Sequence, residues 1–215
     1  MKPTKLKATI FSLANGSLGL ALYLAFTPAF GSVVIDDWTT GHNVSTGSNV
    51  NPTAAASILS GGSVGGYRNV WVEETDDPNE FQMRSQAAAA TRIGSHAEDS
   101  GVNGFSVLIW DGSASAPTAE DDLNPTGLGG INLTSGCPSS AQALSFVIAD
   151  PENSVDIRIE VYSNGTDWSF SEVTVPADTN TAVAFSFPGD FSTGGTNPAN
   201  FTSVGAIRLK VDPAG

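Results

Sequence analysis

Apolar and polar residues alternate with a period of two along much of the second half of the chain. The clearest segment alternates four aliphatic residues with four polar ones: Val155, Ile157, Ile159 and Val161 against Asp156, Arg158, Glu160 and Tyr162. This period is typical of a β-strand with one buried face and one solvated face. The pattern therefore predicts a strand over 155–162 whose aliphatic side chains face the core.

A turn signal follows this strand. Asn164 and Gly165 both tolerate positive φ and favour a hairpin. A loop of two or four residues would place Trp168 and Phe170 on the same face as Val161, in the core. The later valines of the second strand, 173 and 175, have the opposite phase, so we expect a bulge within that strand.

Other segments predict further strands. Residues 105–110 and 143–148 are apolar on both faces, as in buried strands. The segment 82–93, with four successive alanines, is predicted as a strand, although a short helix also fits. Together the pattern indicates eight or nine short strands between Gly, Pro, Asn and Asp turns. The fold class predicted is all-β, a two-sheet antiparallel β-sandwich of the jelly-roll type.

The first 31 residues have a different pattern. Lysines at positions 2, 5 and 7 precede an apolar run that ends near Phe26, and Ala29-Phe30-Gly31 offers small residues for cleavage. This is the pattern of a secretory signal peptide. The alternative, a membrane anchor, needs a longer apolar run to cross about 30 Å of hydrocarbon. We therefore expect a signal helix at 1–31, removed before Ser32, and a single domain at 32–215 in a secreted or cell-surface protein.

The predicted mature chain is strongly acidic. Removing residues 1–31 takes away three of the nine Lys and Arg residues and none of the 22 Asp and Glu residues, which leaves a net charge of −16. Such a chain repels nucleic acid and anionic membrane surfaces. The charge fits solubility or the binding of a cation.

No residue spacing selects a catalytic site. Gly61-Gly62-Ser63-Val64-Gly65 matches the pattern of a nucleophile elbow, but a helix does not follow it, so a glycine-rich loop is favoured. His42 and His96 lie in polar, loop-like surroundings, and no spacing ties either to a serine. We therefore predict no catalytic residues.

Two candidate binding sites can be named. Asp37 follows the first apolar segment of the domain and Asp212 ends the last strand, so their carboxylates could share a structural Ca²⁺ if the terminal strands are neighbours. The alternative is that both aspartates are solvated. Trp71 and Tyr162 share strand faces with charged residues, so they are the candidate ligand-binding aromatics, although a position at the edge of the core also fits.

Several short motifs resemble those of bacterial exported proteins, common in cyanobacteria and proteobacteria, of the PEP-type C-terminal sorting group. The motifs are Ile58-Leu59, Gly65-Gly66-Tyr67-Arg68-Asn69-Val70, Trp110-Asp111-Gly112, Gly127-Leu128-Gly129-Gly130-Ile131-Asn132-Leu133-Thr134 and Phe201-Thr202-Ser203-Val204-Gly205-Ala206-Ile207. The resemblance spans roughly 33–212. It implies export and a β-sandwich similar to galactose-binding and carbohydrate-binding jelly rolls. The sorting signal itself is absent, so the protein is either released freely or a fragment.

The leading hypothesis is a non-catalytic extracellular module that binds carbohydrate or exopolysaccharide. The alternative is a structural matrix protein without a small ligand, and a glycan hydrolase is third. Aromatic residues lining a groove would favour the first, whereas a flat, uniformly acidic surface would favour the second.

Overall fold

The computed structural model describes residues 20–23, 33–46, 52–76, 82–90, 92–98, 102–135, 143–149 and 153–213. This part of the chain contains thirteen strands and one short 3-10 turn, η1 (Val64–Gly66). The strands are β1 (Leu20–Tyr23), β2 (His42–Ser45), β3 (Thr53–Leu59), β4 (Tyr67–Asp76), β5 (Met83–Ala88), β6 (Ile93–Glu98), β7 (Asn103–Trp110), β8 (Ala143–Ala149), β9 (Val155–Tyr162), β10 (Trp168–Val175), β11 (Asn180–Ser186), β12 (Ser192–Thr193) and β13 (Ala206–Pro213).

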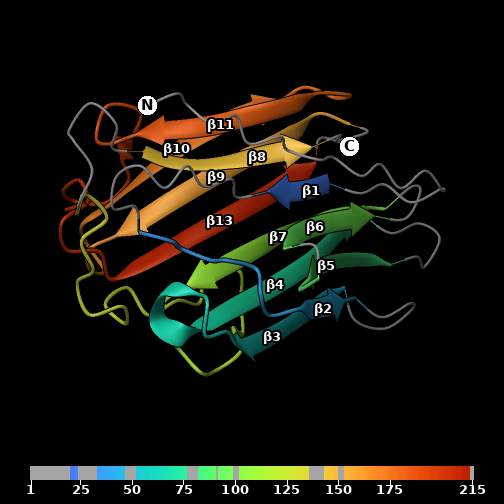
Figure 1. Ribbon diagram of the computed structural model, residues 1–215, viewed down its shortest axis with the longest axis horizontal. Helices are drawn as coiled ribbons and strands as arrows, with labels where there is room; N and C mark the ends of the chain where they lie inside the picture. The colour runs from blue at the N-terminus through green and yellow to red at the C-terminus, as the bar shows by residue number, and fades with distance from the viewer. Residues whose placement is uncertain are drawn as a thin grey trace, which may run out of the picture.

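The strands form two sheets that lie face to face (Figure 1). One sheet has six strands in the order β11-β8-β1-β6-β5-β2, and the other has seven in the order β12-β10-β9-β13-β7-β4-β3. Every ladder between neighbouring strands of these sheets is antiparallel. The protein is therefore all-β and β-sandwich-like, as the hydrophobic pattern predicts.

The predicted signal peptide lies largely outside the described residues, as does its predicted cleavage position at Ser32. Within it, Leu20–Tyr23 is the short strand β1, which pairs with β6 on one side and β8 on the other. These four residues are extended, whereas the sequence predicts a helix. Among the described residues, no helix has the length and apolar character needed to cross a membrane.

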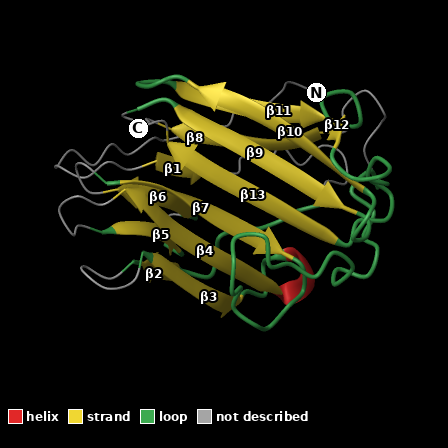
Figure 2. Cartoon of the chain, turned by 180° about the vertical axis from the view of Figure 1, so that it is seen from behind, coloured by secondary structure: helices red, strands yellow, loops and turns green. Residues whose placement is uncertain are grey.

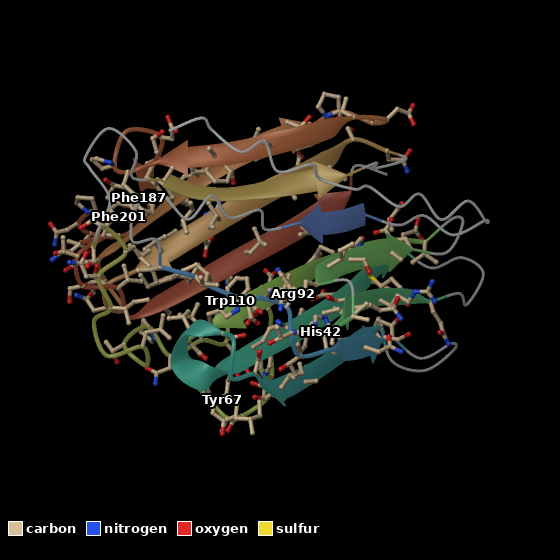
Figure 3. The ribbon with its side chains drawn as sticks, in the orientation of Figure 1. His42, Tyr67, Arg92, Trp110, Phe187 and Phe201 are labelled. Atoms are coloured by element: carbon tan, nitrogen blue, oxygen red, sulfur yellow. The ribbon has the colours of Figure 1, made fainter. Side chains whose placement is uncertain are left out.

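The main core lies between the sheets. Ile157, Ile159 and Val161 of β9 point inward, and Ile159 is only 4% exposed. They pack in one cluster with Phe185 of the opposite sheet. At one end of the molecule the rings of Phe187 and Phe201 stack with their centroids 4.4 Å apart (Figure 3).

The ambiguous segment 82–93 is a hairpin. Residues 83–88 form β5 and Ile93 begins β6, so the strand prediction is confirmed only for the first part of the segment. The prediction that the two histidines lie in loops is wrong. His42 is in β2 and His96 is in β6, where it is buried, because short strands rich in Gly, Ser and Ala carry little apolar signal.

The hairpin between β9 and β10 differs from the prediction in one decisive way. Its loop, 163–167, has five residues, and Trp168 pairs directly with Tyr162. An odd loop length reverses the phase, so Trp168 and Phe170 share the outward face with Tyr162. The ladder continues without a shift to Val175, so the expected bulge is absent from it. The side chain of Asn164 stabilises the loop by accepting hydrogen bonds from the backbone N–H groups of residues 166 and 167.

Candidate ligand-binding site

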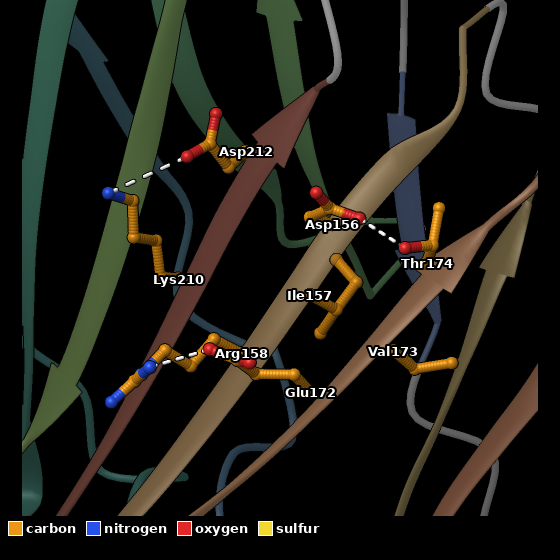
Figure 4. A pocket seen from close by; sticks show the side chains of 8 residues that line it. All are labelled: Asp156, Ile157, Arg158, Glu172, Val173, Thr174, Lys210 and Asp212. Carbon is orange, nitrogen blue, oxygen red and sulfur yellow. Dashed lines mark hydrogen bonds and ion pairs between the residues drawn. The ribbon is translucent and has the colours of Figure 1, made fainter.

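An open groove lies on the outward face of the seven-stranded sheet, over β9, β10 and β13. Figure 2 shows these three strands side by side in that sheet. It has a volume of about 440 Å³, which falls within the usual range for small-ligand sites. Six of its eight lining residues are polar or charged, namely Asp156, Arg158, Glu172, Thr174, Lys210 and Asp212, and the other two are Ile157 and Val173 (Figure 4). All six follow from the period-two pattern, because they occupy the strand positions that alternate with the core residues.

The two cations of the groove already contact carboxylates. Arg158 donates from Nε to Oε1 of Glu160 at 2.6 Å and from Nη1 to Oε1 of Glu172 at 2.5 Å. Lys210 Nζ lies 3.5 Å from a carboxylate oxygen of Glu120 and 3.6 Å from one of Asp212. The groove therefore has no cation whose charge is left unopposed among its lining residues.

Glu160 of β9 is buried next to the groove, where it contacts Arg158. Only 1% of it is exposed. Its carboxylate accepts hydrogen bonds from Arg158, Arg208 and the hydroxyl of Tyr162. Burial by itself would raise the pKa of Glu160, but the hydrogen bond and charge of Arg208, with the bonds from Tyr162 and Arg158, lower it overall. Burial, followed by the charge of Glu160, raises the pKa of Tyr162. This network holds the side chains of the outer face in fixed positions.

A row of aromatic rings continues from the groove along β10. The ring of Trp168 stacks on Tyr162 with centroids 5.3 Å apart, and Phe170 lies 6.0 Å from Trp168. The guanidinium of Arg158 covers the ring of Phe170 at 4.2 Å. Trp168 and Phe170 are both partly exposed. The row joins an aromatic surface to the polar groove on the same sheet face.

The insert at residues 113–125 covers the other half of this face. Leu123 packs on a cluster of outward-facing residues that includes Trp71 and Phe105. The backbone carbonyl of Glu120 accepts a hydrogen bond from Arg208 at 3.2 Å. The insert thus buries the face over β4 and β7 and leaves the face over β9 and β10 open.

The two aromatics predicted to bind ligand lie on this outer face but not together. Trp71 and Tyr162 are each 9% exposed. Trp71 is beneath the insert, and Tyr162 is covered by Trp168. Trp71 is on β4 and Tyr162 is on β9, three strand spacings away across the sheet. The registers also offset the two residues by four positions along the strands, so about 20 Å separates them. Little of either ring is accessible. Trp168 and Phe170, which the sequence pattern placed in the core, are instead partly exposed on this face.

The predicted calcium ligands are likewise not brought together. Asp37 lies against Gly62, before β4 begins, and its carboxylate accepts hydrogen bonds from Thr39 that lower its pKa. Asp212 is at the far end of the sheet, beside the pairing of Val211 with Ser106. Among the described residues, no group of three or more His, Cys, Asp or Glu side chains is placed to hold a metal ion.

A buried ion pair anchors the segment that precedes β2. Asp36 and Arg68 are both 0% exposed. The carboxylate of Asp36 accepts hydrogen bonds from Arg68, from Nε1 of Trp110 at 2.9 Å and from the hydroxyl of Ser63 at 2.6 Å. The hydroxyl of Ser63 is therefore committed to the interior, which confirms that the Gly-x-Ser-x-Gly match is a structural loop.

His42 contacts Arg68 of this ion pair and makes the stability of the protein depend on pH. Burial, together with the charge of Arg68, lowers the pKa of His42 from 6.5 to about 4, against a smaller opposing effect of Asp36. The unfolded chain therefore binds a proton that the folded protein does not as pH falls from 6.5 to 4. We expect the free energy of unfolding to fall by up to about 3 kcal/mol across this window because of His42. Denaturant unfolding of the wild type and of His42→Gln at several pH values should show a shallower decline in the variant, and parallel curves would contradict the assignment.

The second histidine, His96, is buried and contacts a serine and a carboxylate. Nδ1 of His96 lies 2.6 Å from the hydroxyl oxygen of Ser106, and Nε2 lies 3.2 Å from Oε1 of Glu98. These residue types occur together in serine hydrolases. However, all three are buried, and the adjoining cavity has only about 10 Å³, the space of one water molecule. The cluster therefore serves as a polar link between β6 and β7 rather than as a site open to a glycan.

Comparisons with family models, with curated proteins and with solved structures found no match in any of the three sets. The likeness to exported proteins of the PEP-type sorting group therefore remains a prediction from the motifs quoted above.

The structure does give these motifs a shared physical role. Asp111 accepts hydrogen bonds from the side chain of Asn69 at 2.9 Å and from the backbone of Asn124 at 2.8 Å. A side chain at Gly127 would bring its Cβ within 1.9 Å of the Asp111 carbonyl oxygen, so glycine is required there. Backbone bonds also join 128 to 205, 131 to 204 and 133 to 201. The motifs thus close one end of the two-sheet structure.

Proposed function

We propose that the protein is a secreted or cell-surface module of the jelly-roll type that binds carbohydrate or exopolysaccharide on the outer face of the seven-stranded sheet. The observation that carries the proposal is the open groove beside Phe170 and Trp168. Aromatic rings present apolar faces on which sugar rings stack. Arginine, carboxylate and hydroxyl groups at the same face supply hydrogen bonds to sugar hydroxyls.

The surrounding structure supports binding rather than a purely structural role. The groove is concave, and its lining mixes both signs of charge. A flat, uniformly acidic face would have favoured a matrix protein without a small ligand. The leader pattern at 1–31 and the motif resemblance support export. A ligand in this groove would rest on strands rather than on loops, so the binding surface is already formed before the ligand arrives.

The proposal predicts that the exposed aromatic pair contributes directly to affinity. We expect Phe170→Ala and Trp168→Ala each to weaken binding to a neutral oligosaccharide by about tenfold, equivalent to roughly 1.4 kcal/mol. Isothermal titration calorimetry against a panel of neutral oligosaccharides measures this loss. The free energy of unfolding of each variant checks that the fold is retained.

Trp71→Phe is the matched control, because Trp71 lies under the insert and away from the groove. We expect this variant to bind as the wild type does. If Trp71→Phe weakened binding while the two alanine variants did not, the site would lie on the covered half of the face. Failure of every oligosaccharide to bind would refute the proposed function.

A further inference from the structure

The groove offers mainly hydrogen-bond acceptors to a ligand. Both of its cations contact carboxylates within or next to it, as described above. Three carboxylates remain at the surface, and Asp212 and Glu172 have side chains that are 47% and 55% exposed. A carboxylate has two oxygens that each accept more than one hydrogen bond. A bound molecule therefore meets more acceptors than donors.

Two of these carboxylates face each other across neighbouring strands. Asp156 on β9 pairs directly with Asp212 on β13. Like charges in this position repel. Asp156 accepts one hydrogen bond from the hydroxyl of Thr174 at 2.5 Å, and Asp212 lies 3.6 Å from Lys210. A ligand group that donates hydrogen bonds to both carboxylates would relieve the repulsion, whereas an anionic group would increase it.

Arg158 links the groove to the aromatic row, because it lines the groove and its guanidinium lies over the ring of Phe170. Along β10 they extend from Thr174 to Trp168, six residues or about 20 Å. That length accommodates several linked sugar rings, with the aromatic end contacting ring faces and the acidic end contacting ring substituents. A single surface thus combines stacking with a charge preference.

We propose that this surface selects a glycan whose ring substituents donate hydrogen bonds, namely hydroxyl or amino groups, and rejects glycans that carry carboxylate or sulfate groups. The inference rests on the proposed function and names the ligand class of the same groove. The net charge of −13 for the whole chain acts in the same direction, because it repels polyanions.

The test measures how tightly the full chain binds three oligosaccharides of equal length: a neutral glucan, a chitosan oligomer and a polygalacturonate oligomer. Calorimetry is run in calcium-free buffer at about 0.15 M salt, where charges beyond about 8 Å are screened. We expect the glucan and chitosan oligomers each to bind at least tenfold more tightly than the polygalacturonate oligomer.

The double variant Asp156→Asn, Asp212→Asn tests whether the groove carries this preference. Each exposed charge interaction is worth up to about 1 kcal/mol. The variant should therefore reduce the ratio between the dissociation constants for polygalacturonate and glucan by about threefold to tenfold. The control Asp76→Asn, Asp190→Asn removes the same charge from exposed positions outside the groove and should leave the gap unchanged.

The outcomes separate the two proposals. Polygalacturonate binding that comes within tenfold of either donor glycan would overturn the selectivity and leave carbohydrate binding in place. An equal effect of both double variants would show that net charge, not the groove, sets the preference, and would also overturn it. If none of the three oligomers binds, both proposals fail.

Discussion

Asp36→Asn is expected to lower the free energy of unfolding by about 3–5 kcal/mol, because it leaves the fully buried guanidinium of Arg68 without its counter-charge. Five hydrogen-bond donors converge on this carboxylate, including the indole N–H of Trp110 and the backbone N–H of Trp38. Asparagine can accept some of these bonds but cannot neutralise the charge. Denaturant titration of the variant and the wild type measures the loss.

Asp37→Asn is the matched control on the neighbouring residue. Its side chain bonds locally to Thr39, and an amide oxygen can accept the same bonds, so we expect a loss below about 1 kcal/mol. The double variant Asp36→Leu, Arg68→Met should be more stable than Asp36→Asn, because removing both charges leaves neither unpaired. Similar losses for the two asparagine variants would show that the buried pair is not the anchor of this segment.

Ile159→Ala is expected to cost about 2–5 kcal/mol, through lost burial and the cavity it creates. Ile159 lies at the centre of β9, paired with β10 on one side and β13 on the other, and packs in the main core. Leu59→Ala deletes apolar atoms from a strand end that is 70% exposed. We expect that control to change stability by less than about 0.5 kcal/mol. If Ile159→Ala cost as little stability as the control, Ile159 would not face the core and the assigned orientation of β9 would be wrong.

Strands with strict alternation could be predicted from the sequence because the pattern itself encodes their burial. The inward aliphatic residues of β9, such as Ile159, follow directly from the period of two. The strands β2 and β6 were missed, because their small and polar residues carry little hydrophobic contrast. Their burial depends on contacts that form only in the folded protein, such as those of His96 with Ser106 and Glu98.

The candidate site depends on a loop length that local propensities did not determine. Asn164-Gly165 correctly indicated a turn, but a loop of five residues instead of two or four moves Trp168 and Phe170 from the core to the outer face. Trp71 illustrates a second limit. Its strand face was predicted correctly, but the insert that covers it comes from residues about 50 positions later. Coverage of this kind depends on tertiary structure.

The position of β13 has a consequence for how the protein is made. β13 lies in the middle of the seven-stranded sheet. Among the described strands, β9, β10 and β12 lie on one side of it and β7, β4 and β3 on the other, and β13 alone joins the two groups. Ile207 pairs with Trp110, 97 residues earlier in the chain. Closing such distant contacts is slow, because the intervening loop must be ordered first. A nascent chain therefore carries two separate parts of this sheet until β13 is synthesised, and a chain ending before Ala206 would never join them.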